Sequence, residues 1–74
     1  MPDQATVAQI VAGNIRRIRI RKGITQDGLA ERAGLNKTHM YRIENAIQSP
    51  TMTTLERIAG ALGVRMATLL RGCP

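Results

Sequence analysis

The apolar residues of the chain recur every three or four positions, in stretches separated by glycine and proline. In the first stretch they form one stripe, made of Val7, Ile10, Val11, Ile15 and Ile18. This spacing is the period of an amphipathic α-helix, and the alternation that marks a β-strand is not sustained anywhere in the sequence. The chain is therefore predicted to be all-α.

Five helices are predicted from these stripes and from the residues that begin and end them. They cover residues from 3 or 6 to 22, 26–33, 36–45, from about 49–51 to 62, and 65–71. Thr25 and Asn36 are the predicted N-caps of the second and third helices, and Gly34 is the predicted stop between them. Because 74 residues can fill only one core, we expect a single compact five-helix domain over residues 1–74.

The charge of the chain suggests the kind of partner it binds. Eleven Lys and Arg residues stand against five Asp and Glu residues, a formal net charge of +6. This excess favours a polyanionic partner, with nucleic acid first and an anionic membrane surface second. The membrane alternative would rest on the first helix, but the sequence has no Trp or Phe to anchor it. A third alternative is that the charge serves solubility only.

The sequence contains no motif for catalysis. No nucleophile is paired with a base, and no glycine loop could cradle a phosphate. Cys73 is the only cysteine, which leaves no internal disulfide or cysteine-built zinc site. Residues 1–6 lack the parts of a secretory signal, and no apolar run approaches the roughly 20 residues that span a bilayer. We expect a cytoplasmic protein that is not an enzyme and has no cofactor, metal or membrane segment.

Residues 26–45, QDGLAERAGLNKTHMYRIEN, predict two helices that meet at a steep angle across a short turn. Gly34 stands where the backbone must turn left-handed at the end of the first of these helices. Met40 and Ile43, three residues apart, would face the core from the second. The outer face of that helix then carries long or hydrogen-bonding side chains, namely Lys37, Thr38, Tyr41 and Arg42.

The residues that frame this segment show a resemblance to a known family. They are Ile18-Arg19, Gly23-Ile24-Thr25-Gln26, Leu29-Ala30, Gly34-Leu35, Ile43-Glu44-Asn45, Pro50, Leu55 and the run 58–64. With this spacing the chain resembles the helix-turn-helix family of lambdoid phage repressors and Cro proteins. That family also includes short bacterial regulators and the controller proteins of restriction-modification systems. The resemblance implies a lambda-repressor-like frame of five helices that binds double-stranded DNA and regulates transcription.

The resemblance also implies roles for particular residues. Gln26 would contact a phosphate from the N-terminus of its helix, whose positive dipole end suits an anion. Asn36 and Asn45 match positions that hydrogen-bond the DNA backbone on either side of the groove. A recognition helix over about residues 37–44 would reach base edges with Lys37, Thr38, Tyr41 and Arg42. The simpler alternatives are a solvated helix face for the two basic residues and a helix-start role for Gln26.

Arg19 and Glu44 match family positions that pair with each other. They are expected to form a partly buried ion pair that ties the first helix to the third. We therefore predict a structural role for both residues, and no contact with bases. Loss of one partner would leave an uncompensated charge, at a cost of about 3–5 kcal/mol if the site is well buried.

Three positions depart from the family pattern. Gly28 stands where an acidic residue would complete a capping box with Thr25, so we expect a weaker second helix. Ala46 stands where a glycine usually follows the recognition helix, so Asn45 or Ala46 is expected to adopt a left-handed or altered turn. His39 lies on the recognition helix, where a lone histidine is not a metal site but could approach a phosphate or a pyrimidine edge.

A homodimer is expected because specific binding usually needs two half-sites, roughly 34 Å apart. The contact surface would come from the fifth helix and its flanking loops. Its candidates are apolar residues beyond what the core needs: Ile47, Met66, Ala67 and Leu70. The simpler alternative is that Leu69 and Leu70 only cover the core. A second possible function is an antitoxin-like module that also binds a heterologous protein.

Overall fold

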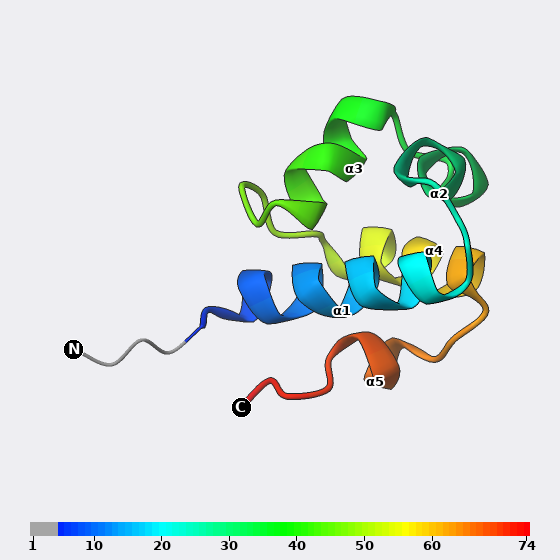
Figure 1. Cartoon of the computed structure of the whole chain (residues 1–74). Coiled ribbons are helices and arrows are strands. Elements are labelled where there is room, and N and C mark those ends of the chain that lie inside the picture. Colours follow the sequence, from blue (N-terminus) through cyan, green and yellow to red (C-terminus); the bar gives the residue numbers. More distant parts are fainter. Residues whose placement is uncertain (1–4) are drawn as a thin grey trace.

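The computed structural model describes residues 5–74, and all five predicted helices are present in it (Figure 1). They are α1 (Val7–Arg21), α2 (Gln26–Ala33), α3 (Lys37–Glu44), α4 (Met52–Leu62) and α5 (Met66–Leu69). Residues 5–74 contain no strand. The prediction of an all-α fold with five helices is confirmed.

α1 begins at Val7 because Thr6 caps it. The Thr6 Oγ1 accepts a hydrogen bond from the backbone N–H of Gln9 at 3.1 Å, and the Gln9 Oε1 accepts one from the N–H of Thr6 at 2.9 Å. This reciprocal pair is a capping box, which satisfies two backbone donors that a helix end leaves free. Of the two expected starts for this helix, Thr6 is confirmed, whereas Asp3 lies outside the described residues.

α5 is shorter than the sequence predicted, because it ends at Leu69 and does not continue to Arg71. Beyond Leu69, the N–H of Cys73 bonds to the carbonyl of Leu70 at 3.0 Å, and the helical pattern is not continued. The Asn14 Nδ2 of α1 donates to the carbonyl oxygens of Leu69 and Arg71 at 2.8 and 2.9 Å, which satisfies carbonyls that the end of a helix leaves free. A side chain 55 positions away in the sequence thus caps the end of α5.

Aliphatic side chains from all five helices form one core. Its buried members are Val11, Ile15, Ile18, Leu29, Ala30, Ala33, Met40, Ile43, Leu55, Ile58, Ala59, Leu62 and Leu69. Met40 and Ile43, the inward positions predicted for α3, are both among them. Tyr41 is the only aromatic residue of the chain and is 52% exposed, so the core is stabilised by aliphatic burial alone.

The arrangement of the helices leaves α3 at the surface. Figure 1 shows α1 across the middle of the molecule, with α2 and α3 on one side of it and α5 on the other. α4 contacts α1, α2 and α5, which closes the core. α3 rests on α1 and α2 and keeps its remaining face toward solvent.

Candidate nucleic-acid interface

The turn between α2 and α3 is set by Gly34, which has a φ of 71°. Its N–H bonds to the carbonyl of Glu31 at 3.2 Å, and the N–H of Leu35 bonds to the carbonyl of Ala30 at 2.9 Å. This pair of bonds is a Schellman motif, which needs a residue in the left-handed region. Because the turn is so tight, α3 begins three residues after Gly34, and the two helices form a helix-turn-helix unit.

Both helices of this unit begin at side-chain caps, as predicted. The Thr25 Oγ1 accepts from the N–H of Gly28 at 2.9 Å, and the Asn36 Oδ1 accepts from the N–H of His39 at 2.6 Å. Asn36 therefore uses its oxygen for α3, which leaves its Nδ2 as the group that could donate to a phosphate. A Cβ atom at Gly28 would lie 2.9 Å from the Thr25 Oγ1, so a larger residue there would have to shift the cap.

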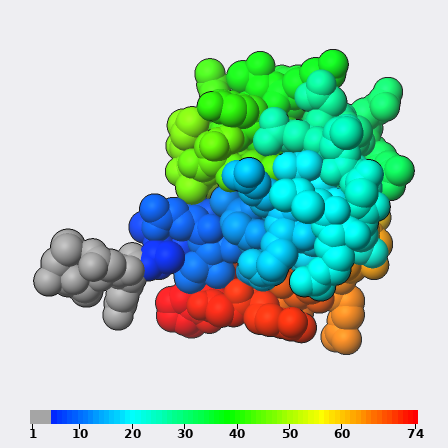
Figure 2. Space-filling view, in the orientation of Figure 1, coloured from blue at the N-terminus to red at the C-terminus, as the bar shows by residue number. Residues whose placement is uncertain are grey.

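The outer face of α3 carries the four side chains predicted to reach base edges. Lys37, Thr38, Tyr41 and Arg42 are all exposed, whereas Met40 and Ile43 on the inner face are 0% and 1% exposed. Residues spaced by one, four and five positions share one side of a helix, so the four form a single outer face. In the space-filling view, α2 and α3 together form one end of the molecule (Figure 2).

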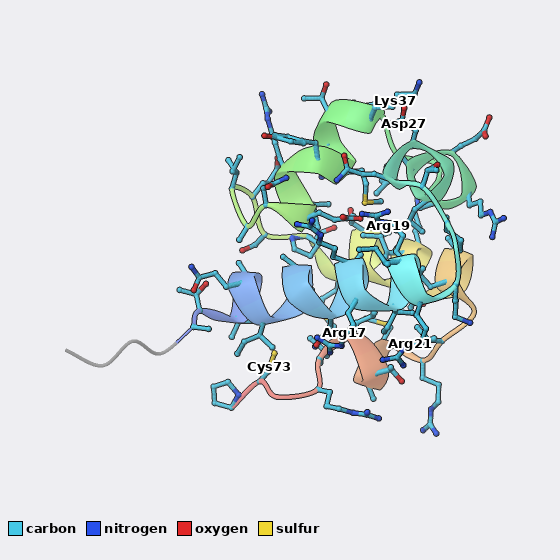
Figure 3. The ribbon with its side chains drawn as sticks, in the orientation of Figure 1. Arg17, Arg19, Arg21, Asp27, Lys37 and Cys73 are labelled. Carbon is cyan, nitrogen blue, oxygen red and sulfur yellow. The ribbon has the colours of Figure 1, made fainter. Side chains whose placement is uncertain are left out.

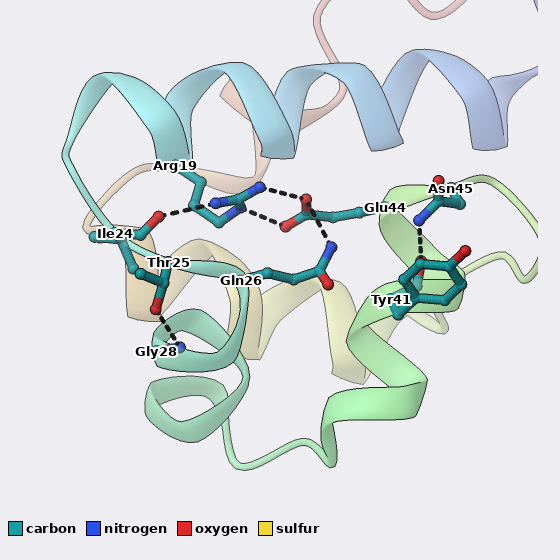
Figure 4. Close-up of polar contacts among 8 residues, drawn as sticks. All are labelled: Arg19, Ile24, Thr25, Gln26, Gly28, Tyr41, Glu44 and Asn45. Carbon is teal, nitrogen blue, oxygen red and sulfur yellow. Dashed lines mark hydrogen bonds and ion pairs between the residues drawn. The ribbon is translucent and has the colours of Figure 1, made fainter.

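Asn45 lies just after α3 and is also exposed. Its Nδ2 donates to the backbone carbonyl of Tyr41 at 2.8 Å (Figure 4). The amide thus satisfies one of the carbonyls that the end of a helix leaves without a partner. This bond uses one of the two amide hydrogens, so the other hydrogen of the exposed Asn45 side chain is available to donate to a DNA phosphate.

Gln26, the first residue of α2, is half-buried. Its Nε2 donates to the Glu44 Oε1 at 3.3 Å, which joins the start of α2 to the end of α3 (Figure 4). The bond is long for an amide donor and a carboxylate acceptor. Gln26 therefore lies where the resemblance implies a phosphate contact, with a weak internal bond that a phosphate could replace.

Arg19 and Glu44 form the expected ion pair, which locks α1 to α3. The Arg19 Nε donates to the Glu44 Oε2 at 2.8 Å and its Nη2 donates to the Oε1 at 2.9 Å. The Arg19 Nη1 also donates to the carbonyl of Ile24 at 2.9 Å, so one side chain ties α1, the α1–α2 turn and α3 together (Figure 4). The two side chains are only 12% and 2% exposed. Burial and bidentate geometry together make this contact strong.

α3 ends in the same kind of left-handed turn as α2, but the residue in the left-handed conformation is Ala46 and not a glycine. Ala46 has a φ of 56°, so the left-handed turn expected at Asn45 or Ala46 falls on Ala46. The N–H of Ala46 bonds to the carbonyl of Ile43 at 3.1 Å, and that of Ile47 bonds to the carbonyl of Arg42 at 2.9 Å. A left-handed conformation costs an L residue about 1–2 kcal/mol. The chain therefore leaves α3 through a strained residue.

The basic residues of α1 divide between two sides of the helix. Arg19 points toward α3, whereas Arg17 and Arg21 lie on the side of α5 (Figure 3). The Arg17 Nη2 donates to the Asn14 Oδ1 at 2.6 Å, which ties it to the side chain that caps the end of α5. Arg17 and Arg21 therefore lie away from the outer face of α3.

Lys37 and Asp27 form a second ion pair, at the edge of the outer face of α3. The Lys37 Nζ lies 3.5 Å from the Asp27 Oδ2, and the two side chains are 74% and 62% exposed. No role was predicted for Asp27 or Asn14 from the sequence. The place of Asp27 directly after Gln26 could have drawn attention to it in the sequence. Its distance from Lys37 could not be predicted, because it depends on how α2 and α3 cross.

The residues considered for self-association lie on different sides of α1. Met66 and Leu70 are half-buried and pack against the core, while Ala67 of α5 is exposed. Ile47 is 66% exposed in the loop after α3. Figures 1 and 2 show α1 between that loop and α5. The structure therefore does not bring Ile47 together with the three residues near α5.

Residues 5–74 hold no group of three or more His, Cys, Asp or Glu side chains that could bind a metal ion. His39 instead lies near Gln48, with its Nε2 3.5 Å from the Gln48 Nε2. None of the described helices combines the length and the apolar character that crossing a membrane requires.

A helix-turn-helix family model matches residues 15–69 of the chain. Together with the five-helix frame and the geometry of α2 and α3, this match shows the class of protein. The chain belongs to the helix-turn-helix family of DNA-binding transcription regulators, and the resemblance to phage repressors and controller proteins is confirmed.

Individual relatives support this assignment. A hypothetical transcription factor from Neisseria meningitidis is 33% identical over 70 residues, which are 95% of this chain and 66% of the relative. Its crystal structure has a TM-score of 0.86 to this chain and covers 95% of it and 80% of the solved chain. The immunity repressor of Bacillus phage phi105 is 37% identical over 60 residues, which are 81% of this chain and 42% of the repressor.

A third relative is a restriction-modification controller protein, C.Esp1396I. Its wild-type crystal structure is 30% identical to this chain, with a TM-score of 0.81 over 89% of this chain and 86% of the other. The chain thus spans nearly the whole of this relative. It spans just under two thirds of the Neisseria protein and less than half of the phage repressor.

Proposed function

We propose that the chain binds an operator in double-stranded DNA as a homodimer, with α3 in the major groove. The observation that carries this proposal is the difference between the two sides of α3. Its inner side is buried and tied to α1, while its outer side presents Lys37, Thr38, Tyr41 and Arg42 to solvent. A helix held from behind in this way offers its outer side chains to base edges in a fixed position, which sequence recognition requires.

The other contacts in this proposal go to the DNA backbone. Gln26 would donate from the N-terminus of α2, where the helix dipole also favours an anion. Asn36 would donate through its Nδ2, since its oxygen caps α3. Asn45 would donate at the other end of α3 through its second amide hydrogen, while the first stays bonded to the Tyr41 carbonyl. Backbone contacts of this kind fix the register of the protein on the duplex but carry no sequence information.

The proposed dimer contact lies on α5. Ala67 is exposed there between the half-buried Met66 and Leu70, which gives a small apolar surface. The loop after α3, which carries Ile47, lies on the other side of α1, so Ile47 would meet the partner at a separate point. A small contact predicts weak association in solution and tighter association on DNA with two half-sites.

Selection of bound duplexes from a random pool tests the proposal. We expect one preferred half-site repeated with two-fold symmetry, at a centre-to-centre spacing of roughly 34 Å. Neutralisation of about eight phosphates predicts a log–log salt slope near −7. The proposal is wrong if the pool yields no preferred sequence, or if the protein fails to bind duplexes of any sequence at low salt.

Charge placed at the dimer contact tests the assembly. Ala67→Glu should reduce affinity for the two-half-site duplex and leave binding to a single half-site unchanged. Ile47→Glu, measured on the same two duplexes, tests whether Ile47 forms the second point of contact. If neither substitution distinguishes the two duplexes, the proposed dimer surface is wrong even if DNA binding is established.

A further inference from the structure

We infer that Asp27 is a specificity residue: its carboxylate restrains Lys37, which weakens binding to DNA of arbitrary sequence more than binding to the operator. The inference rests on the proposed function, because it concerns the same face of α3. Asp27 would not touch a base. It would act through Lys37, as a positioning residue.

The geometry brings the two side chains together from different helices. Asp27 is the second residue of α2 and Lys37 is the first residue of α3, and their charged atoms lie 3.5 Å apart (Figure 3). Both line the hollow between the two helices, together with Glu31. The pair is exposed, so either partner can leave it when another charge approaches.

The position of Asp27 is unusual for a surface that binds DNA. It follows Gln26, so in the proposed complex its carboxylate would lie near the phosphate that Gln26 contacts. Glu44, at the end of α3, is buried and neutralised by Arg19. The Asp27 carboxylate is exposed, so in the proposed complex it would face the approaching phosphates. Like charges at short range oppose that approach.

The pair affects the two kinds of DNA differently because they use Lys37 differently. Binding to arbitrary sequences depends almost entirely on phosphate contacts. A free lysine on its flexible stem can reach any nearby phosphate, whereas a lysine paired with Asp27 must first give up its partner. On the operator, Lys37 meets a base edge in a defined direction, and Asp27 holds its ammonium group near that position. Asp27 therefore lowers the affinity for arbitrary sequences more than it lowers the affinity for the operator.

Two duplexes test this inference: the preferred duplex from the selection experiment, and a scrambled duplex of equal length and composition. In Asp27→Asn, we expect affinity for the scrambled duplex to rise about threefold, the size of effect that surface ion pairs have. Its log–log salt slope should become steeper by about 0.9, because the freed Lys37 neutralises one more phosphate. Affinity for the preferred duplex should rise less, so the specificity ratio should fall.

Glu31→Gln is the matched control. It removes the same charge from the same helix and the same hollow, but Glu31 forms no ion pair within residues 5–74. Its effect on both duplexes should be equal, with an unchanged specificity ratio. A second control places Asp27→Asn in a Lys37→Gln background, where the change in salt slope should vanish because the freed group is gone.

The outcomes separate this inference from the proposed function. If the wild-type protein prefers no sequence, the proposed function fails and the inference fails with it. Suppose that the wild type prefers a sequence, but Asp27→Asn changes the affinities for the two duplexes by the same amounts as Glu31→Gln. In that case only the inference is overturned. A steeper slope that persists in the Lys37→Gln background would also overturn it, because the effect would then not pass through Lys37.

Discussion

The inner side of α3 is closed to solvent, whereas its outer side is open along its whole length. On the inner side, Met40 and Ile43 pack in the core and Glu44 is held by Arg19. On the outer side, Lys37 has one exposed ion pair and Tyr41 is half exposed. The contacts that hold α3 in place are thus separate from the side chains proposed to recognise DNA. Substitutions on the inner side should change stability, and those on the outer side should change recognition.

The largest effect is expected from the inner side, at Glu44. Glu44→Ala removes the partner of Arg19 and leaves a nearly buried guanidinium without a carboxylate. We expect the free energy of unfolding to fall by about 3–5 kcal/mol, as when one partner of a buried pair is lost. Urea denaturation followed by circular dichroism measures this. Glu56→Ala, an exposed acid on α4, is the control and should change stability by less than about 0.5 kcal/mol.

Arg42→Ala, on the outer side of α3, should weaken base recognition and leave stability nearly unchanged. We expect stability to stay within about 0.5 kcal/mol of wild type, while discrimination at one base pair of each half-site falls by about 1–3 kcal/mol. Competition binding against single-base variants of the preferred duplex measures the loss. Arg32→Ala, which removes an exposed arginine from the last turn of α2, is the control. Equal losses on preferred and scrambled DNA would remove Arg42 from the set of base contacts.

A smaller change in stability is expected at the turn that ends α3. Ala46→Gly should relieve the left-handed strain and raise stability by about 1 kcal/mol. The matched reverse substitution is Gly34→Ala, where no atom lies within 4 Å of an added Cβ, so the cost would come from the backbone alone. Thermal unfolding of the two variants should show shifts of opposite sign. An Ala46→Gly variant no more stable than wild type would mean that the turn is not strained.

Gln26→Ala is expected to give the smallest change. The loss of one neutral donor should weaken binding by about 0.5–1.5 kcal/mol, equally for preferred and scrambled duplexes. The salt slope should not change, because no charge is removed. Filter binding at several salt concentrations measures both quantities. A loss confined to the preferred duplex would assign Gln26 to base recognition and contradict the phosphate contact.

Local sequence was sufficient wherever a feature depends on a few neighbouring residues. Thr25 and Asn36 were predictable as N-caps, because a cap is a bond between a side chain and a backbone group three residues away. The turn at Gly34 followed from the same short-range geometry, whereas the altered turn at Ala46 was predicted from the family pattern, in which a glycine usually stands there. The inner and outer sides of α3 followed from its helical period. The prediction of the Arg19–Glu44 contact depended on family resemblance, since the two residues are 25 positions apart.

Tertiary packing decided the features that join distant parts of the chain. The end of α5 was predicted at about Arg71 but falls at Leu69, and the carbonyls of Leu69 and Arg71 are satisfied by Asn14 of α1. The pairing of Asp27 with Lys37 depends on how α2 and α3 cross. The loop after α3, which carries Ile47, lies away from α5 because α1 passes between them.

By itself, then, the sequence determined the helices, their caps and the residues that face outward on α3. These properties depend on backbone bonds and side-chain directions within one or two turns. Only the folded chain decided which distant groups meet, because several crossings of five short helices are compatible with the same apolar pattern, and packing selects among them.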